Sequence, residues 1–223
     1  MTFIYKNLNK IALLVFIFTV ITFVAQTTKA QTGPELFITW KANSYIPPTY
    51  EGKALPIQGS EITLVVGLLD SGRFANLTNN EIRWYDGINL IGKGKGKVTI
   101  TTTAKSDQNI RAEIMNYRGA DLNKTINIPT TNPEIYIFPE IQPNQIIFKA
   151  IPYFFTINNP NELIINWSVN GIKAEGSPKD QTTLITNTSN LINKSQLLTY
   201  VVAKNSKNST ESVNKQLKLV ILK

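Results

Sequence analysis

The chain has no cysteine and no histidine among its 223 residues. It therefore lacks Cys and His ligands for zinc, thiol nucleophiles, and any catalytic arrangement that depends on a histidine base. β-Sandwich domains of this size fold without disulfide bonds, so the missing cysteines leave the cellular compartment open. These two absences disfavour the commonest catalytic centres and favour a binding or structural role.

Acidic residues are also scarce, with 15 Asp and Glu against 23 Lys and Arg. Paired carboxylates could hydrolyse glycosides without histidine, but the acids are scattered and fall mainly at expected turns or outward strand positions. The chain has no Asp-x-Asp-x-Asp calcium loop, and Asp70 and Asp86 could share an ion only if folding brought them together. We therefore predict that the protein is not an enzyme and has no catalytic residue, metal or cofactor.

Long runs of good helix formers are missing as well, whereas β-formers, Asn and Thr are abundant. A hydrophobic content of 42% is enough for packed cores, and 223 residues allow one large or two small domains. The composition predicts an all-β protein.

A tryptophan strand that ends in a turn occurs twice, and the prediction of the fold depends on this repeat. In residues 82–87 and 165–171 a tryptophan, Trp84 or Trp167, lies on an alternating apolar strand that ends in Asp-Gly or Asn-Gly. Both dipeptides tolerate the positive φ of a type I′ hairpin turn. The alternation predicts that Trp84 and Trp167 are core residues of two β-sandwiches, and a binding role for them is the alternative.

A second repetition indicates the domain boundaries. Pro-Glu followed by an apolar run begins at residue 34 and again at residue 133, which is 99 positions later and close to the length of one sandwich. We predict one domain over residues 31–130 and another over 131–223, joined by a short polar segment. We expect strands at 34–40, 61–69, 82–85, 98–103, 110–117 and 124–129, and at 133–138, 145–155 with a bend at Pro152, 165–169, 181–186, 197–203 and 215–221.

The N-terminal residues have the pattern of an export signal. Lys6 and Lys10 precede an apolar run over residues 11–25, and Ala30 offers a small residue for cleavage. We predict a signal peptide over residues 1–30, and the alternative is an uncleaved helix that anchors the protein in the membrane through residues 11–25. Either reading places the protein outside the cytoplasm, extracellular or in the cell envelope. Because three lysines of the net charge of +8 belong to the signal, the exported part keeps +5, which does not indicate nucleic acid.

A run of alternating glycine and lysine, residues 92–97, is the first candidate contact site. We predict a flexible cationic loop that serves as a solvated hairpin connection, whose lysines protect a sheet edge from strand addition. The alternative is that Lys93, Lys95 and Lys97 contact a polyanion.

Tyrosines form the second candidate. Tyr45 and Tyr50 flank Pro47-Pro48, which excludes a central strand and predicts an extended, polyproline-like connection over residues 41–56. We predict that Tyr45 and Tyr50 pack over the sandwich edge and hold the connection in place. The alternative is that they, together with Tyr85, make aromatic contacts to a ligand.

Several of these features carry a family resemblance. The strand order, the two Trp strands with their turns, and residues 114–119 and 200–205 resemble tandem bacterial immunoglobulin-like or PKD-like modules. Residues 50–56, 68–72 and 82–87 also resemble uncharacterised exported proteins of small-genome bacteria. The resemblance covers roughly residues 34–223 and implies an envelope or surface location with binding or scaffolding roles. The disulfide of antibody domains is missing, and Asp86-Gly87 matches only part of the acidic turn of PKD-like modules.

Two functions from different classes follow. The favoured one is a non-enzymatic exported surface or envelope interaction or scaffold protein, adhesin-like or associated with pilus or secretion assembly, whose partner is an unidentified envelope protein or polymer. The alternative is an accessory module that binds carbohydrate or anionic envelope polymers through Lys93, Lys95, Lys97 and exposed aromatics such as Tyr85.

Overall fold

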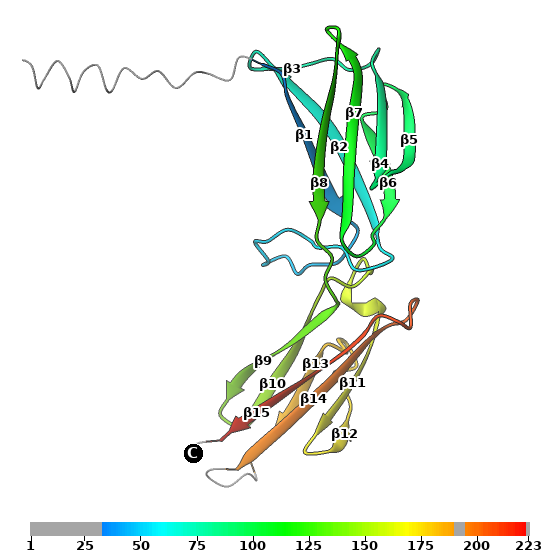
Figure 1. Ribbon diagram of the computed structural model, residues 1–223. Helices are drawn as coiled ribbons and strands as arrows, with labels where there is room; N and C mark the ends of the chain where they lie inside the picture. Colours follow the sequence, from blue (N-terminus) through cyan, green and yellow to red (C-terminus); the bar gives the residue numbers. More distant parts are fainter. Residues whose placement is uncertain (1–32, 190–194, 222–223) are drawn as a thin grey trace, which may run out of the picture. The chain divides into compact units, whose positions relative to one another are not determined.

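The computed structural model describes residues 33–189 and 195–221 (Figure 1). Strands dominate this part of the chain, and its one helical element is the 3-10 turn η1 (Pro160–Glu162). Within the same residues no helix has the length and apolar character needed to cross a membrane. The predicted signal or anchor lies outside the described residues.

The first eight strands form two sheets. In one, β2 pairs with β1 on one side and with β3 and β6 on the other, and the second sheet has the order β5-β4-β7-β8. The strands are β1 (Glu35–Ala42), β2 (Glu61–Asp70), β3 (Arg73–Phe74), β4 (Glu81–Asp86), β5 (Asn89–Lys95), β6 (Thr99–Thr103), β7 (Gln108–Tyr117) and β8 (Ala120–Ile128).

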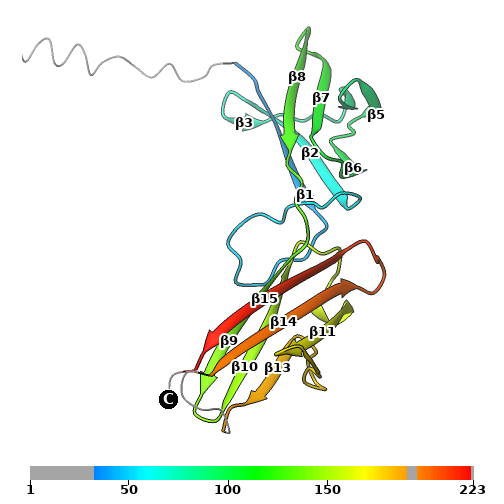
Figure 2. The same cartoon turned by 60° about the horizontal axis from the view of Figure 1, so that its bottom comes forward.

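The remaining strands form two further sheets, with orders β13-β10-β9 and β12-β11-β14-β15. Their edge strands β9 and β15 lie side by side in both views (Figure 1, Figure 2). The strands are β9 (Glu134–Gln142), β10 (Gln145–Tyr153), β11 (Leu163–Val169), β12 (Ile172–Ala174), β13 (Thr183–Asn187), β14 (Gln196–Asn205) and β15 (Ser212–Val220). The prediction of an all-β protein built from two pairs of sheets is confirmed.

By their internal contacts the described residues fall into a small unit, 33–35 with 68–75, and a large unit that contains the rest. In the small unit the end of β2 turns back into β3, with Leu69 opposite Phe74 and Asp70 opposite Arg73. Ser71 and Gly72 both have positive φ (51° and 76°), which is the type I′ geometry that Gly and small polar residues tolerate.

The core between the sheets of β9–β15 is continuous. Side chains that alternate along β10, including Ile146 and Phe148, meet Trp167 and Val201 from the facing sheet, and all four are almost completely buried. The sheets of β1–β8 show the same alternation of buried side chains. The buried residues are Ile62, Leu64 and Val66 on β2 and Ile82 and Trp84 on β4. This alternation follows from the period of two that a strand imposes on its side chains.

Four expectations about local structure are corrected. Residues 89–95 form strand β5, so most of the glycine-lysine run is not a flexible loop. Pro47 and Tyr50 close a turn through a 2.9 Å bond from the Tyr50 N–H to the Pro47 carbonyl, because the fixed φ of Pro48 suits the second turn position. The connection is therefore not extended at that point.

The other two corrections concern strand ends. The first hairpin turn is Gly87-Ile88, with φ 59° at Gly87, so it is shifted by one residue from Asp86-Gly87. The second turn does consist of Asn170-Gly171, at φ 51° and 82°. β10 is a continuous strand to Tyr153, with Pro152 paired opposite Ile135, and it ends where Phe154 adopts a positive φ of 64°.

Candidate functional site

The glycine-lysine run has the pattern of an edge strand. On β5, Gly92 and Gly94 lie opposite the buried residues Trp84 and Ile82 of β4, whereas Lys93 and Lys95 lie opposite Arg83 and Glu81. Opposite residues in an antiparallel pair share one face, so the glycines face the core and the two lysines face solvent. A Cβ on Gly92 would come within 2.6 Å of the Ile100 side chain, which explains why glycine occupies the inner position.

The face that carries Lys93 and Lys95 contains charges of both signs. Arg83 pairs with Glu81 at 2.7 Å and Arg111 pairs with Glu113 at 3.3 Å. The Glu81 carboxylate raises the pKa of Arg83 through the same hydrogen bond. The face remains cationic, but half of the cationic charge is already neutralised by neighbouring acids.

Tyr85 and Lys97 occupy different positions from the two outward lysines. The Arg111 guanidinium lies 4.4 Å from the centre of the Tyr85 ring, so one ring face is already covered by a cation. The Lys97 side chain lies close to Gly92 and Gly94 at the inner side of β5. The structure therefore brings Lys93 and Lys95 together and places Lys97 apart from them.

Tyr45 contacts the polypeptide that follows β10. Its N–H donates to the Phe155 carbonyl and its carbonyl accepts from the Phe154 N–H, both at 2.7 Å, and its ring packs against the core of β9–β15. Burial, with a smaller contribution from Tyr153, raises the pKa of the Tyr45 phenol. These contacts give Tyr45 the role of holding the connecting segment in place.

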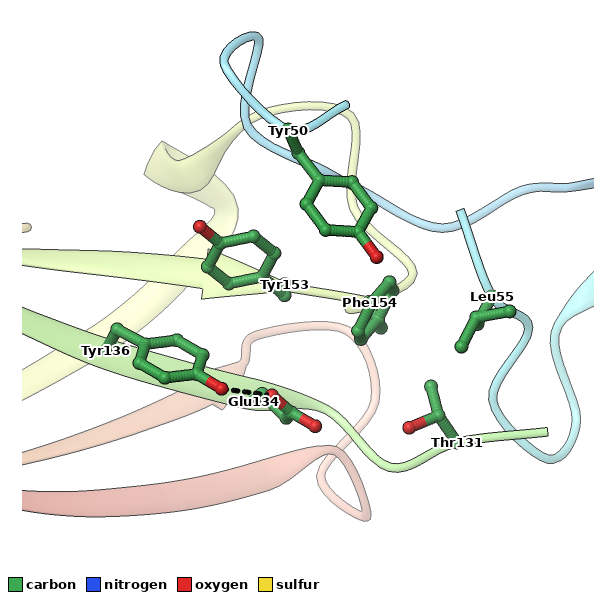
Figure 3. A pocket seen from close by; sticks show the side chains of 7 residues that line it. All are labelled: Tyr50, Leu55, Thr131, Glu134, Tyr136, Tyr153 and Phe154. Carbon is green, nitrogen blue, oxygen red and sulfur yellow. Dashed lines mark hydrogen bonds between the residues drawn. The ribbon is translucent and has the colours of Figure 1, made fainter. Parts of the chain in front are cut away.

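Tyr50 instead belongs to an aromatic pocket of about 370 Å³ (Figure 3). Its ring lies edge-on to those of Tyr153 and Phe154, with centroids 5.5 and 5.9 Å away. Gly52 permits this position, because a Cβ there would come within 2.4 Å of the Tyr50 ring. The pocket is lined by Tyr50, Leu55, Thr131, Glu134, Tyr136, Tyr153 and Phe154.

Sequence analysis identified Tyr50 but missed Tyr136, Tyr153 and Glu134. The register of β9 and β10 places Tyr153 opposite Glu134, and Ile151 opposite Tyr136, so these side chains share one face. The outward alternation of aromatic residues along these two strands was the available signal.

The same outer face of the β13-β10-β9 sheet is unusually apolar. Phe138 is 58% exposed and Ile185 is 53% exposed, and half-buried Ile147 and Ile151 lie on the same face of β10. Lys149 lies opposite Phe138 and forms an ion pair of 3.2 Å with Glu140. Tyr136 and Tyr153 of the aromatic pocket lie on this same face.

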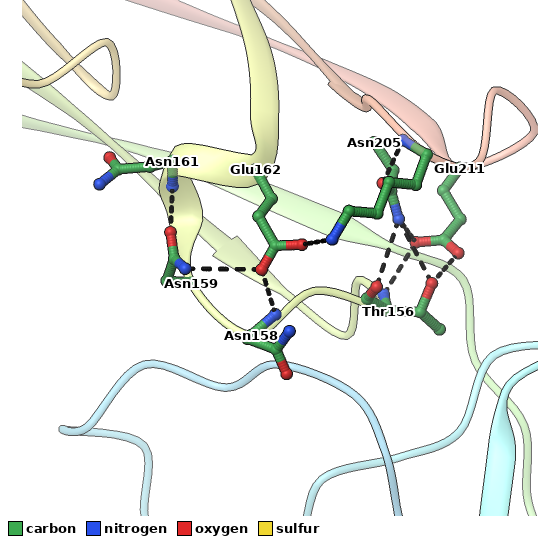
Figure 4. Close-up of polar contacts among 8 residues, drawn as sticks. Thr156, Asn158, Asn159, Asn161, Glu162, Asn205 and Glu211 are labelled. Atoms are coloured by element: carbon green, nitrogen blue, oxygen red, sulfur yellow. Dashed lines mark hydrogen bonds and ion pairs between the residues drawn. The ribbon is translucent and has the colours of Figure 1, made fainter.

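A polar network near η1 contains a buried carboxylate, Glu211, that sequence analysis did not single out (Figure 4). Glu211 accepts hydrogen bonds from the Thr156 N–H (2.8 Å) and hydroxyl, from Asn205 (3.0 Å) and from Asn208 (2.8 Å). Burial by itself raises the pKa of this carboxyl, but the bonds from Thr156 and Asn205 outweigh it and hold the pKa below its ordinary value. A carboxylate with this many protein donors is a structural group.

Glu162, at the end of η1, is the second carboxylate in Figure 4. The Lys207 ammonium donates to it at 2.6 Å and the Asn158 N–H donates at 2.9 Å. These bonds lower the pKa of Glu162 to about 2. The ion pair connects η1 to the turn after β14, which indicates a stabilising rather than a catalytic role.

The two aspartates considered for calcium have separate surroundings. Asp86 accepts bonds from Lys105 (2.8 Å) and Gln108 (3.2 Å), whereas Asp70 accepts from Ser71 at 3.1 Å. Across residues 33–189 and 195–221, no group of three Asp or Glu side chains is arranged to hold a metal ion.

Comparisons with known proteins find only distant structural likeness. No protein-family model matches the chain, and no curated protein matches it. The fibronectin(III)-like modules of Clostridium thermocellum CbhA share 10% identity at a TM-score of 0.29, covering 83% of this chain and 94% of theirs. Three N-terminal domains of the bacteriophage RB49 outer capsid protein Hoc share 11% identity at a TM-score of 0.34, covering 85% and 70%. Likeness at this level carries over no activity, ligand or partner.

Proposed function

We propose that the chain is a non-enzymatic, exported surface or envelope interaction protein that binds a protein partner through the outer face of the β13-β10-β9 sheet. The observation that carries this proposal is the exposure of Phe138 (58%) and Ile185 (53%) on one face with Ile147 and Ile151. Monomeric proteins rarely leave contiguous apolar surface of this kind uncovered.

The chemistry of the face favours a protein over a polymer of sugars or phosphates. Its centre is aliphatic and aromatic, and two of its charged groups, Lys149 and Glu140, pair with each other. An apolar centre with a polar margin is typical of protein interfaces. An adhesin-like role, or a scaffold role in pilus or secretion assembly, fits such a surface.

Capture from envelope extract tests the proposed surface. We expect the mature protein with Phe138→Ser and Ile185→Ser to retain its fold and to lose at least tenfold in partner capture. The matched control is Ile88→Ser with Ile172→Ser, which removes an apolar side chain that is 92% exposed in a hairpin turn and one that is 74% exposed at the start of β12. Equal capture by both double variants would contradict the proposal.

Export is the second part of the proposed function. Lys6, Lys10 and the apolar run 11–25 support a cleaved signal, so we expect the mature chain to begin near Gln31. Intact mass of protein recovered from the envelope measures this directly. A chain that keeps residues 1–30 and needs detergent for extraction would establish the membrane anchor instead.

Binding of anionic polymers is the alternative, and it is favoured by the outward pair Lys93 and Lys95 on β5. Screened attraction weakens as the Debye length falls from about 10 Å at 0.1 M salt to about 3 Å at 1 M. If these residues form the site, changing Lys93, Lys95 and Lys97 to Gln should shorten retention on an anionic column more than changing the exposed residues Lys124, Lys179 and Lys218. Equally shortened retention of both triple variants would show that retention depends only on the net charge of the protein.

A further inference from the structure

The aromatic pocket is an open hollow whose rings lie at right angles to one another (Figure 3). Tyr136 and Tyr153 have centroids 5.4 Å apart and an interplanar angle of 82°, and Tyr50 meets Tyr153 at 76°. Phe154 meets Tyr50 at 83°. Rings arranged in this way do not form the flat platform on which a sugar ring stacks. They form several sides of a hollow that suits a compact, rounded group.

The charge of the pocket favours a cation. Of the seven described residues that line it, Glu134 is the one that carries a charge. Its carboxylate accepts a hydrogen bond of 2.9 Å from the Tyr136 hydroxyl, and this bond raises the pKa of Tyr136, which therefore stays a neutral donor. An anionic ligand would meet both the carboxylate and the negative faces of the rings.

Tyr136 already attracts a cation from the protein itself. The Lys215 ammonium lies 5.3 Å from the centre of its ring. Aromatic rings hold cations through their quadrupole, and the interaction strengthens when the cation is weakly hydrated. A primary ammonium keeps much of its hydration, whereas a trimethylammonium group presents methyl groups to apolar walls.

We propose that this pocket binds a trimethylammonium group, with Tyr50, Tyr136 and Tyr153 as its aromatic walls and Glu134 as the counter-charge. Leu55 and Phe154 contact the methyl groups, and Gly52 keeps the Tyr50 ring over the pocket. The pocket shares Tyr136 and Tyr153 with the sheet face of the proposed protein interface, but Phe138 and Ile185 do not line it, so different variants test the two proposals.

Titration of the mature protein with choline tests the proposal, with binding followed by ligand-observed NMR or calorimetry. The decisive comparison is 3,3-dimethylbutan-1-ol, which has the shape of choline without its charge. We expect it to bind at least tenfold more weakly than choline. We also expect Glu134→Gln and Tyr50→Ala each to weaken choline binding about tenfold. Tyr200→Ala, which removes a partly exposed tyrosine of β14, should leave it unchanged.

A second variant separates loss of the pocket from loss of the fold. Gly52→Ala forces the Tyr50 ring away from its position without removing any lining side chain, so it should weaken choline binding while the thermal melt stays close to that of the parent. Equal binding of choline and the neutral alcohol would overturn the proposal, and so would an absence of choline binding at 100 mM in the folded protein. Partner capture that survives such a failure would leave the proposed interface intact.

A lipid head group and a small solute can both supply a trimethylammonium group, and two binding experiments distinguish these sources. Binding to phosphatidylcholine vesicles, lost in Tyr50→Ala, would identify a lipid head group. Binding to choline or glycine betaine without vesicle binding would identify a small solute. Both results support a trimethylammonium site, whereas vesicle binding that Tyr50→Ala and Glu134→Gln leave unchanged would overturn it.

Discussion

The two buried tryptophans satisfy their one polar group in the same way. The Trp84 indole N–H donates to the Lys97 carbonyl at 2.9 Å, and the Trp167 indole N–H donates to the Gln181 carbonyl at 3.0 Å. Both side chains are at most 1% exposed. Each ring therefore combines a large buried area with a bond to the chain that passes over it.

Replacing either tryptophan should be costly. We expect Trp84→Ala and Trp167→Ala each to lower the free energy of unfolding by about 3–5 kcal/mol, the range for emptying a buried aromatic site. Trp84→Phe and Trp167→Phe, which keep most of the apolar area and lose the hydrogen bond, should cost less. Urea denaturation measures all four, with Trp40→Ala as the partly exposed control. A loss below 1 kcal/mol in an Ala variant would contradict the expectation.

Glu211 should make stability depend on pH. Because its folded-state pKa lies below the unfolded value of about 4.3, the stabilisation is complete above that value and is lost as pH falls through the folded pKa. Glu211→Gln should lower the free energy of unfolding at pH 7 by about 1–3 kcal/mol, since buried donors lose a charged acceptor.

Melting curves from pH 7 to pH 3 check this. The parent should lose stability more steeply below pH 5 than Glu211→Gln does. Glu51→Gln, at an exposed glutamate, is the matched control and should leave the pH profile of the parent unchanged. Parallel pH profiles for the parent and Glu211→Gln would show that Glu211 does not contribute.

At the scale of elements, β5 shows how a sheet edge is closed tightly over a core. The inner position 92 is a glycine because Ile100 occupies the space that a side chain would need. The outer positions of β5 are lysines, which discourage another strand from pairing with this edge. Gly92 is thus a structural requirement whether or not the lysines also bind a ligand.

Adding side chains at the inner glycines should disturb this packing. We expect Gly92→Val to lower the free energy of unfolding by about 1–3 kcal/mol, the usual cost of overpacking. Ile100→Val should recover part of the loss in the double variant, because it frees space at the contact. Gly33→Ala, where a Cβ would meet nothing within 4 Å, is the control and should be neutral. A neutral Gly92→Val would show that β5 can move away from the core.

At the scale of the whole molecule, no strand of β1–β8 shares a ladder with a strand of β9–β15 among the described residues. The division into two domains, 31–130 and 131–223, stays a prediction, because both groups of strands contribute to the large unit. The connecting segment complicates the division, since Tyr45 and Tyr50 contact residues 153–155. A fragment that begins at residue 131 loses those contacts.

Separate melts of the two fragments test the division. We expect both to fold, and we expect fragment 131–223 to melt several degrees below the corresponding transition of the mature chain. Tyr45→Ala in the mature chain should lower the same transition, whereas Tyr85→Ala should not. An unfolded fragment 131–223 would show that the segment around Tyr45 is part of that domain.

Strands, inward tryptophans and most turns could be predicted from the sequence because they depend on nearest neighbours. Period-two alternation determines which residues of β2 and β10 face the core, and Asn170-Gly171 specifies a turn through its own φ preferences. The aromatic pocket could not be predicted in this way. Tyr50 and Tyr136 are separated by more than 80 positions, and only tertiary folding brings them together. The bonds that keep Glu211 ionised likewise come from Thr156 and Asn205, which no local pattern connects to it.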